Sequence, residues 1–370
     1  MKNGWRTRHL GDLCEVVGGG TPPKGNPAYY SGKIPWATVR DMRQEVITET
    51  ECRITKEAVQ SSATNIIPSG NVVIATRVGL GKVCMLDQDT AINQDLRGII
   101  PRDTKSLSVR FLFLWLKSIA DRIVAEGTGA TVQGVKLPFV KSLQIPICPL
   151  PEQKRIVGIL DKAFDGIATA KANAEKNLKN ARALFESRLQ GEAGPKVALG
   201  ELVEIKTGKL DANAAVEGGK YPFFTCSREA YAIDTYAFDC EAVLLAGNNA
   251  VGDFNVKYFV GKFNAYQRTY VLTINEKKHA LCRYVYFQLE KSLKKFKSQS
   301  VGAGTKFLKL GMIRDLDIPL PSLAEQAQAV AQLDALATET RRLASLYEQK
   351  LAALAALKKS FLHQAFAGEL

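Results

Sequence analysis

The chain has 370 residues, of which 46% are hydrophobic, so its length allows two or three domains and its composition is sufficient for buried cores. Fifty Lys and Arg against 37 Asp and Glu give a net charge of +13, which favours a polyanionic partner, although a basic protein without such a partner would look the same. Seven Cys without a CxxC pair, and no apolar stretch of about 18 residues, argue against a disulfide framework, a zinc site and a membrane span, and favour a reduced cytoplasm.

The first globule is predicted to occupy residues 1–149 and to mix short strands with a helix and many turns. Residues 71–76 are typical of a buried strand, 77–82 of a glycine-rich turn, and 108–125 of an amphipathic helix. The glycine-rich loop at 127–131 can hold a phosphate through backbone amides and hydroxyls, or can be a plain turn.

A long helix that acts as a spacer is predicted over residues 150–192. Apolar residues recur every three or four positions between Ile156 and Leu189, which places them on one stripe. The 38 residues from Glu152 to Leu189 would span about 57 Å, so the helix can serve as a ruler along duplex DNA, or only as a coiled-coil spacer or an oligomerisation handle. Prolines near the start of each long helix are expected to stop strand pairing and to fix the angle of entry. These are Pro146, Pro149 and Pro151, then Pro319 and Pro321.

The second globule is predicted over residues 193–322 and repeats the order of the first. A strand at 242–246 is followed by a turn at 247–252 and a helix at 283–296. A second glycine-rich loop follows this helix at 302–305.

A second long helix is predicted over residues 323–370. Its apolar residues alternate at three- and four-residue steps from Val330 to Ala365, as in a heptad seam, with a flaw at Lys358. Because neither stripe can remain exposed to water and a whole globule lies between the helices, we expect the two helices to pack on each other in antiparallel orientation.

The two halves of the chain repeat one motif at a constant offset, which indicates an internal duplication. The excess charge belongs to the globules: residues 1–151 carry 19 basic and 13 acidic side chains, and residues 193–323 carry 18 and 13. The repeated residues are Ile145, Pro146, Leu150, Glu152, Gln153, Val157, Leu160 and Asp161, matched by Ile318, Pro319, Leu323, Glu325, Gln326, Val330, Leu333 and Asp334.

Candidate contacts to nucleic acid are the polar and basic side chains in the turns and loops of the globules. Asn or Gln can form two hydrogen bonds with adenine, and Arg can do so with guanine, although any single Asn or Gln can instead cap a turn. The DNA-binding candidates are Arg77, Lys82, Asn93, Gln94, Arg97, Thr131 and Lys136 in the first globule, and Asn248, Asn249, Lys257, Arg268, Lys306 and Lys309 in the second.

Motifs for catalysis are missing from the sequence. Gly81-Lys82 lacks the rest of a phosphate-binding loop, no GxSxG is present, and the three His are scattered without metal-ligand spacing. We therefore expect no catalytic residue, no metal and no cofactor on this chain.

With the repeat, the helices and the missing chemistry in view, the sequence resembles the specificity subunits of bacterial type I restriction-modification enzymes. The second half departs from the first in having Thr207-Gly208-Lys209 in place of Gly-Gly-Thr-Pro, and Ala324 in place of Pro151. The resemblance rests on Gly18-Gly19-Gly20-Thr21-Pro22, Tyr29-Tyr30, Gly32, Ile34-Pro35-Trp36, the junction from Ile145 to Gln153 and its repeat from Pro319 to Gln326.

The resemblance implies an α+β protein with a pseudo-twofold internal repeat. Two similar mixed α/β target-recognition domains, at 1–149 and 193–322, would be separated by two long antiparallel coiled-coil helices, a central one at 150–192 and a C-terminal one at 323–370. Each domain would recognise one half of a bipartite duplex DNA site.

The resemblance also implies partners. The helices would set the gap and dock two methyltransferase subunits, which would carry S-adenosylmethionine and methylate adenine at N6, and motor-nuclease subunits would join for cleavage. An autonomous nuclease, and an RNA-binding or purely structural coiled-coil adaptor, remain the alternatives.

Overall fold

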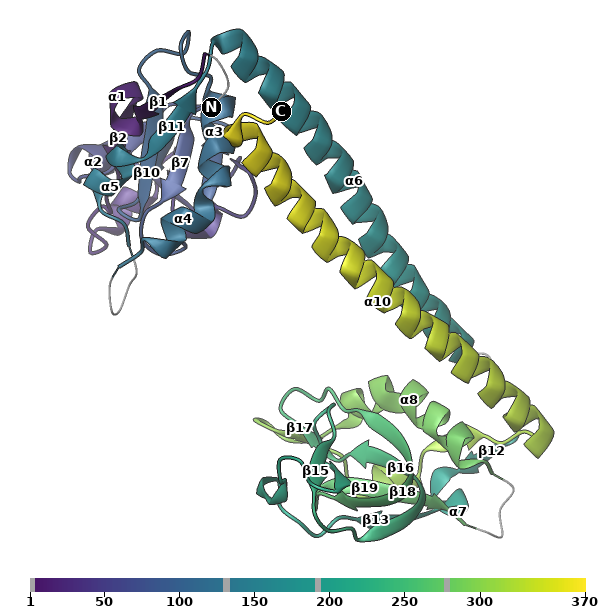
Figure 1. The fold of residues 1–370 in the computed structure, drawn as a ribbon. Helices are drawn as coiled ribbons and strands as arrows, with labels where there is room; N and C mark the ends of the chain where they lie inside the picture. The colour runs from purple at the N-terminus through teal and green to yellow at the C-terminus, as the bar shows by residue number, and fades with distance from the viewer. Residues whose placement is uncertain (1–3, 129–133, 190–193, 276–279) are drawn as a thin grey trace. The chain divides into compact units, whose positions relative to one another are not determined.

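The computed structural model divides the chain into two compact units, and each is described by itself (Figure 1). The first unit comprises residues 1–173 and 350–370, and the second comprises residues 174–349, so both long helices contribute to both units. No helix among the described residues is long and apolar enough to span a membrane. The described residues are 4–128, 134–189, 194–275 and 280–370.

A five-stranded sheet lies at the centre of the first unit. Its middle strand, β7 (Val72–Ala75), consists of four buried apolar residues, the pattern of a strand covered on both faces, and confirms the strand predicted at 71–76. The neighbouring strands are antiparallel, except that β4 and β8 run parallel. The order is β2 (Cys14–Gly18), β10 (Leu96–Pro101), β7, β8 (Val83–Leu86) and β4 (Val46–Ile47).

A four-stranded sheet and a two-stranded ribbon complete the described strands of this unit. In the ribbon, β1 (Arg6–His9) pairs with β11 (Gln144–Ile147), and Pro146 lies opposite Thr7. The expectation that Pro146 stops strand pairing is therefore wrong, because both strands of a ribbon are edges, where a residue without an N–H is tolerated. The four-stranded sheet has the order β5 (Cys52–Ile54), β3 (Ile34–Ala37), β9 (Thr90–Ile92) and β6 (Asn65–Ile67).

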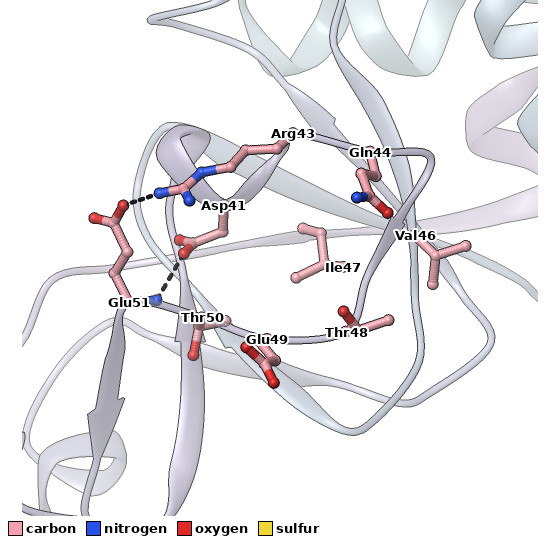
Figure 2. Close-up of a pocket in the computed structure, with 9 residues that line it drawn as sticks. All are labelled: Asp41, Arg43, Gln44, Val46, Ile47, Thr48, Glu49, Thr50 and Glu51. Atoms are coloured by element: carbon pink, nitrogen blue, oxygen red, sulfur yellow. Dashed lines mark hydrogen bonds and ion pairs between the residues drawn. The ribbon is translucent and has the colours of Figure 1, made fainter. Parts of the chain in front are cut away.

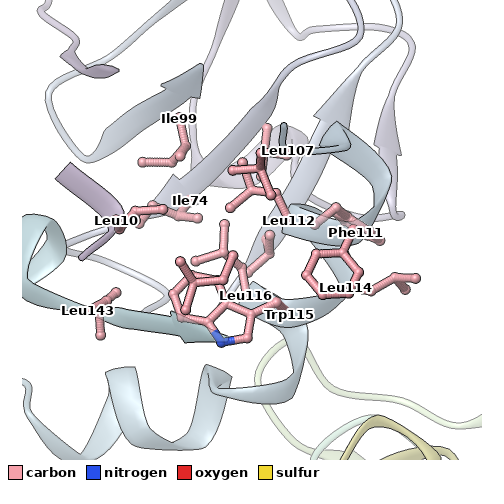
Figure 3. Close-up of a cluster of buried hydrophobic side chains, with 14 of the residues drawn as sticks. Leu10, Ile74, Ile99, Leu107, Phe111, Leu112, Leu114, Trp115, Leu116 and Leu143 are labelled. Atoms are coloured by element: carbon pink, nitrogen blue, oxygen red, sulfur yellow. The ribbon is translucent and has the colours of Figure 1, made fainter. Parts of the chain in front are cut away.

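Two consecutive helices replace the single amphipathic helix predicted over 108–125. The first, α3 (Val109–Ser118), begins where the Ser108 hydroxyl accepts the Phe111 N–H, and its residues 111–116 are all buried. The chain turns at Ile119 and continues as α4 (Ala120–Ala125). Because α3 packs against the sheet on one side and the long helices on the other, it is apolar on most of its surface (Figure 3). The shorter helices are α1 (Leu10–Leu13), α2 (Lys56–Gln60) and α5 (Leu137–Ser142), with 3-10 segments at Pro27–Tyr30 and Val39–Asp41.

The two long helices run antiparallel within the first unit. They are α6 (Leu150–Leu189) and α10 (Leu323–Ala367), and Pro151 lies in the first turn of α6, where proline is tolerated. Arg155 near the start of α6 donates to the Leu370 carbonyl after the end of α10 at 2.9 Å. Further along α6, the ring of Phe164 lies under Lys358, twelve residues before Leu370. The chain directions are therefore opposed, as predicted.

Lys358, the flaw in the predicted heptad seam, ties α10 to the first globule. Its ammonium lies 4.6 Å from the Phe164 ring and 2.9 Å from a Glu45 carboxylate oxygen. Glu45 also meets Lys117 at 3.5 Å and Arg110 at 4.0 Å. A lysine at this seam position is satisfied because its charge faces a carboxylate of the globule and its stem covers a ring.

A six-stranded sheet forms the centre of the second unit. Its strands are antiparallel except where β14 meets β18. The last five residues of β16, Ala242–Ala246, are all buried, which confirms the predicted strand. The order is β13 (Val203–Thr207), β19 (Thr269–Ile274), β16 (Phe238–Ala246), β18 (Val256–Ala265), β14 (Tyr221–Phe224) and β15 (Tyr231–Ile233).

A helix and a two-stranded ribbon of the second unit correspond to elements of the first. The helix α8 (Cys282–Gln299) packs on β16 and β18 and confirms the helix predicted at 283–296. Pro319 lies opposite Lys196 in a ribbon that corresponds to β1 and β11, so it does not stop pairing either. The other elements are β12 (Lys196–Ala198), β17 (Asn248–Asn249), β20 (Lys306–Phe307), β21 (Asp317–Pro319), α7 (Leu199–Leu202), α9 (Leu310–Arg314) and a 3-10 segment at Ala212–Ala214.

Candidate nucleic-acid interface

Three segments of the first globule meet where β7 ends. The N–H of Thr76 donates to the Asp95 carbonyl at 2.8 Å, and the Thr76 carbonyl accepts the Val135 N–H at 2.8 Å. Thr128 and Gly134 pair with each other through two backbone hydrogen bonds of 3.1 and 2.9 Å. We call the described residues of the segments 76–82, 93–97 and 128–135 the first tip. Each segment is a turn or loop, and backbone hydrogen bonds join it to another segment of the tip.

The second globule builds the same frame at the end of β16. The N–H of Gly247 donates to the Arg268 carbonyl at 2.9 Å, and the Gly247 carbonyl accepts the Leu308 N–H at 2.9 Å. Val301 and Phe307 form the paired loop, with hydrogen bonds of 3.2 and 2.8 Å. We call the segments 247–255, 266–268 and 301–308 the second tip. The repeat seen in the sequence therefore extends to the hydrogen bonds of these loops.

Arginines dominate the first tip. Arg77 is half exposed and lies 3.6 Å from Asp95. Arg97 donates through Nη1 to the carbonyls of Gln94 and Leu96 at 2.9 and 2.7 Å. Burial, and next the nearby charge of Arg77, lower the pKa of Arg97, while Asp95 opposes them. The two guanidinium groups thus concentrate positive charge beside a single carboxylate, which favours an anion there.

The amides of the first tip shape its turn. Asn93 is buried, its Nδ2 donates to Asp95 Oδ2 at 3.0 Å, and its Oδ1 accepts the Asp95 N–H at 3.1 Å. Gln94 accepts the Thr21 hydroxyl through Oε1. In this conformation Asn93 has the turn-capping role that is the common one for asparagine, so its position does not favour contact with a base.

The other candidates of the first globule lie around this centre. Lys82 is exposed, and its Nζ lies 3.5 Å from the Val39 carbonyl. Lys136 is exposed at the start of α5. Thr131 lies outside the described residues.

The second tip carries amides and cations on the same frame. Asn248 and Asn249 form β17, opposite Phe307 and Lys306. The Asn249 Oδ1 accepts the N–H groups of Val251 and Asp253 at 2.9 and 3.0 Å, so this side chain closes the turn.

The cationic candidates of the second globule differ in their surroundings. The guanidinium of Arg268 lies over the Phe307 ring, 5.4 Å from its centre, a distance at which the cation is attracted to the ring. Lys257 donates from Nζ to the Ser227 carbonyl and to Asn255 Oδ1 at 2.5 and 2.6 Å, and burial lowers the pKa of its ammonium. Lys309 is exposed where α9 begins.

Two cations near the second tip were missed in the sequence. Arg228 forms an ion pair with Asp253 at 2.6 Å, which brings its loop to the 247–255 turn. The stem of Lys297, on α8, lies beside Gly252. No periodicity or spacing links these positions to the turn, because both approach it through contacts between distant parts of the chain.

A cavity of 340 Å³ in the first globule is lined by residues between Asp41 and Glu51, none of which is a predicted contact (Figure 2). Asp41 accepts the backbone N–H groups of Thr38 and Glu51 through its two oxygens, at 2.7 and 2.8 Å, and Arg43 pairs with Glu51. The carboxylate of Asp41 thus holds the loop that lines the cavity. Across the described residues, no three His, Cys, Asp or Glu side chains gather as ligands of a metal ion would.

The fold and the two tips define a protein with a duplicated α/β module, in which each copy is mounted on long helices and presents a loop frame rich in Arg, Lys, Asn and Gln. The chain belongs to the family described as type I restriction modification DNA specificity domain, whose sequence model matches residues 2–180 and 195–349.

Curated relatives of this chain are specificity subunits of type I restriction enzymes from Escherichia coli. The EcoDI subunit is 41% identical over 174 residues, which are 47% of this chain and 38% of the relative. The EcoR124I/EcoR124II subunit is 33% identical over 173 residues, 45% of this chain and 42% of the relative. The matches therefore span well under half of the length of these relatives.

A solved structure from work on complex assembly and conformational transition of the type I R-M system has a similar fold. Its TM-score is 0.80 at 20% sequence identity, and the match covers 100% of this chain and 99% of that chain. The similarity to that structure concerns the fold alone.

Proposed function

We propose that this chain is the DNA sequence-specificity subunit of a type I restriction-modification enzyme. Each tip recognises one half of a bipartite duplex site, and the helices α6 and α10 set the unread gap and dock two methyltransferase subunits. The chain performs no catalysis itself. It works in the cytoplasm, S-adenosylmethionine binds to the methyltransferase partners, and motor-nuclease subunits join for cleavage.

The observation that carries this proposal is the pair of tips, which share one hydrogen-bond frame but differ in side chains. Asp95 of the first frame corresponds to Arg268 of the second, and Arg77 after Thr76 corresponds to Asn248 after Gly247. Arg and Asn favour guanine and adenine respectively in the major groove. One scaffold with different side chains at matching positions is suited to recognising two different half-sites.

The test uses the purified chain with and without its methyltransferase partners. We expect the complex, given S-adenosylmethionine, to methylate adenine within one two-part duplex sequence. The same sequence should be found by mapping methylated adenines in host DNA with and without this gene. The chain alone with DNA and magnesium should show no turnover. Cleavage by the chain alone would support an autonomous nuclease, and preferential binding of RNA would support an adaptor; either result would overturn the proposal.

A further inference from the structure

Each tip exposes a valine. Val78 is 53% exposed and Val251 is 68% exposed. Each is the most exposed large hydrophobic side chain among the described residues of its unit. A single exposed aliphatic residue needs no explanation, but here the same residue type occurs in both tips.

The two valines occupy the same point of the repeated turn. Val78 directly precedes Gly79 and Val251 directly precedes Gly252, and both glycines have φ +73°. Both turns are closed by the same backbone bond, from Ala75 to Lys82 and from Ala246 to Asn255, each 3.0 Å. Both valines therefore hold the same position relative to the glycine and to the end of the turn, although the second turn is two residues longer.

Packing and hydrogen bonds of the two turns keep the valine side chains from turning toward the interior of the globules. A Cβ on Gly79 would lie 2.6 Å from Val39 Cγ1, so the turn is already packed on its inner side. In the second tip, Asn249 Oδ1 holds the Val251 N–H at 2.9 Å. The isopropyl groups consequently remain on the outer surface of both turns.

The surroundings of the valines indicate what covers them. Arg77 and Arg97 lie in the first tip, and Arg268 and Lys306 lie in the second, so the partner is anionic. An anionic surface that also offers an isolated apolar group is the major groove of DNA, where thymine alone among the four bases carries a methyl group at C5.

We propose that Val78 and Val251 each contact the C5-methyl group of one thymine in their half-sites. This inference rests on the proposed function. Thymine pairs with adenine, the base methylated in the proposed reaction, so a half-site that contains a methylated adenine also contains a thymine.

The test replaces thymine by deoxyuridine, which removes the methyl group and leaves the base pair unchanged. The complex of this chain with its methyltransferase subunits is titrated with site DNA that carries one replacement at a time. We expect one position in each half-site to weaken binding by about fourfold, the effect of losing one buried methyl group. Val78→Ala should abolish the sensitivity in the first half only, and Val251→Ala in the second half only.

Val260→Ala serves as the matched control, since Val260 is 60% exposed on β18 and lies outside the tip. It should retain both sensitivities. Wild-type complex that binds its two-part site but tolerates every deoxyuridine would overturn the proposal, as would a Val78→Ala or Val251→Ala complex that keeps the full response. Failure of the wild-type complex to bind any two-part duplex would instead reject the proposed function itself.

Discussion

Gly19 and Gly208 show which part of the family's glycine-rich opening the fold requires. A Cβ on Gly19 would lie 2.1 Å from the Asn93 carbonyl oxygen, and one on Gly208 would lie 1.8 Å from the Ala265 carbonyl oxygen. The second half of the chain lacks Gly-Gly-Thr-Pro but keeps, at Gly208, a glycine that packs against a backbone carbonyl as Gly19 does. The departure noted in the sequence therefore leaves the steric requirement at Gly19 and Gly208 unchanged.

Replacing either glycine should destabilise its globule. Gly19→Ala and Gly208→Ala would each force the neighbouring backbone apart, at a cost of about 1–3 kcal/mol. Urea unfolding checks this, with Gly25→Ala as the control because nothing lies within 4 Å of that position. Equal midpoints for Gly19→Ala and Gly25→Ala would contradict the prediction.

Glu290 and Glu45 illustrate how one half-buried carboxylate can destabilise the folded protein while another stabilises it. Glu290 on α8 corresponds, in the internal repeat, to Lys117 on α3. Lys117 pairs with Glu45 at 3.5 Å. Burial raises the pKa of Glu290, opposed by a hydrogen bond from Tyr286, and its Oε2 has no hydrogen-bond partner among the described residues. Burial would also raise the pKa of Glu45, but the hydrogen bond from Lys358 and the nearby cations lower it below 4.5.

Stability should therefore respond to pH in opposite senses in the two units. The pKa of Glu290 is raised in the folded protein, so its contribution to stability is present below the ordinary value of 4.5 and is lost as the pH rises through the raised value. Glu290→Gln should therefore stabilise the protein at pH 7 and have little effect near pH 4. The stability from Glu45 is present above 4.5 and lost as the pH falls through its lowered pKa, so Glu45→Gln should destabilise at pH 7. Thermal melts between pH 4 and 8 measure both effects. Destabilisation at pH 7 by Glu290→Gln would contradict the first prediction.

Among the elements, both long helices are joined to their globules by the same pair of contacts. Gln153 is fully buried, accepts the Ser108 N–H at 2.9 Å, and donates to the carbonyls of Ser106 and Cys148 at 2.8 and 2.9 Å. In the second unit, the buried Gln326 accepts the Leu281 N–H at 2.9 Å.

An ion pair accompanies each buried glutamine. Arg110 meets Asp161 at 2.6 Å, and Arg283 meets Asp334. The Gln and Asp residues of the repeated motif are thus the sites where each helix binds its own globule.

Removing the buried amide should loosen a helix from its globule. Gln153→Leu leaves the Ser108 N–H and two carbonyls without a partner, and we expect a loss of about 2–4 kcal/mol in the free energy of unfolding. Gln326→Leu should have a similar effect in the second unit. Gln328→Leu, two residues further along α10 and exposed, is the control, and denaturant titration is the measurement. A Gln153→Leu protein as stable as Gln328→Leu would exclude this role.

At the scale of the whole molecule, the net charge of +13 should make DNA binding strongly dependent on salt. If Arg97 contacts a base, Arg97→Ala should cost about 1–3 kcal/mol at one base position of one half-site and leave the other half unchanged. If Lys309 contacts a phosphate, Lys309→Ala should weaken all sequences alike and lower the salt slope by about one. Binding measured over a range of salt concentrations and single-base variants separates the two; a uniform loss for Arg97→Ala would remove it from the base-contacting set.

The sequence alone determined the duplication, the two long helices with their antiparallel pairing, and the strands at 71–76 and 242–246. Repeats, apolar periodicity and runs of buried residues are local signals, since each reports how one segment meets its own surroundings. Lys358 and Pro146 were misjudged because the local sequence does not show what surrounds them. Lys358 meets Glu45 and Phe164, and Pro146 lies in an edge strand.

Only the tertiary structure decided how the tips are assembled. Thr76 bonds to Asp95 and Val135, and Gly247 bonds to Arg268 and Leu308, across separations that no local pattern encodes. The exposure of Val78 and Val251 is likewise invisible in the sequence, where a valine in a glycine-rich turn looks like any other apolar residue. Which side chains face outward depends on the packing of distant segments, and that packing is settled by the whole core rather than by any one element.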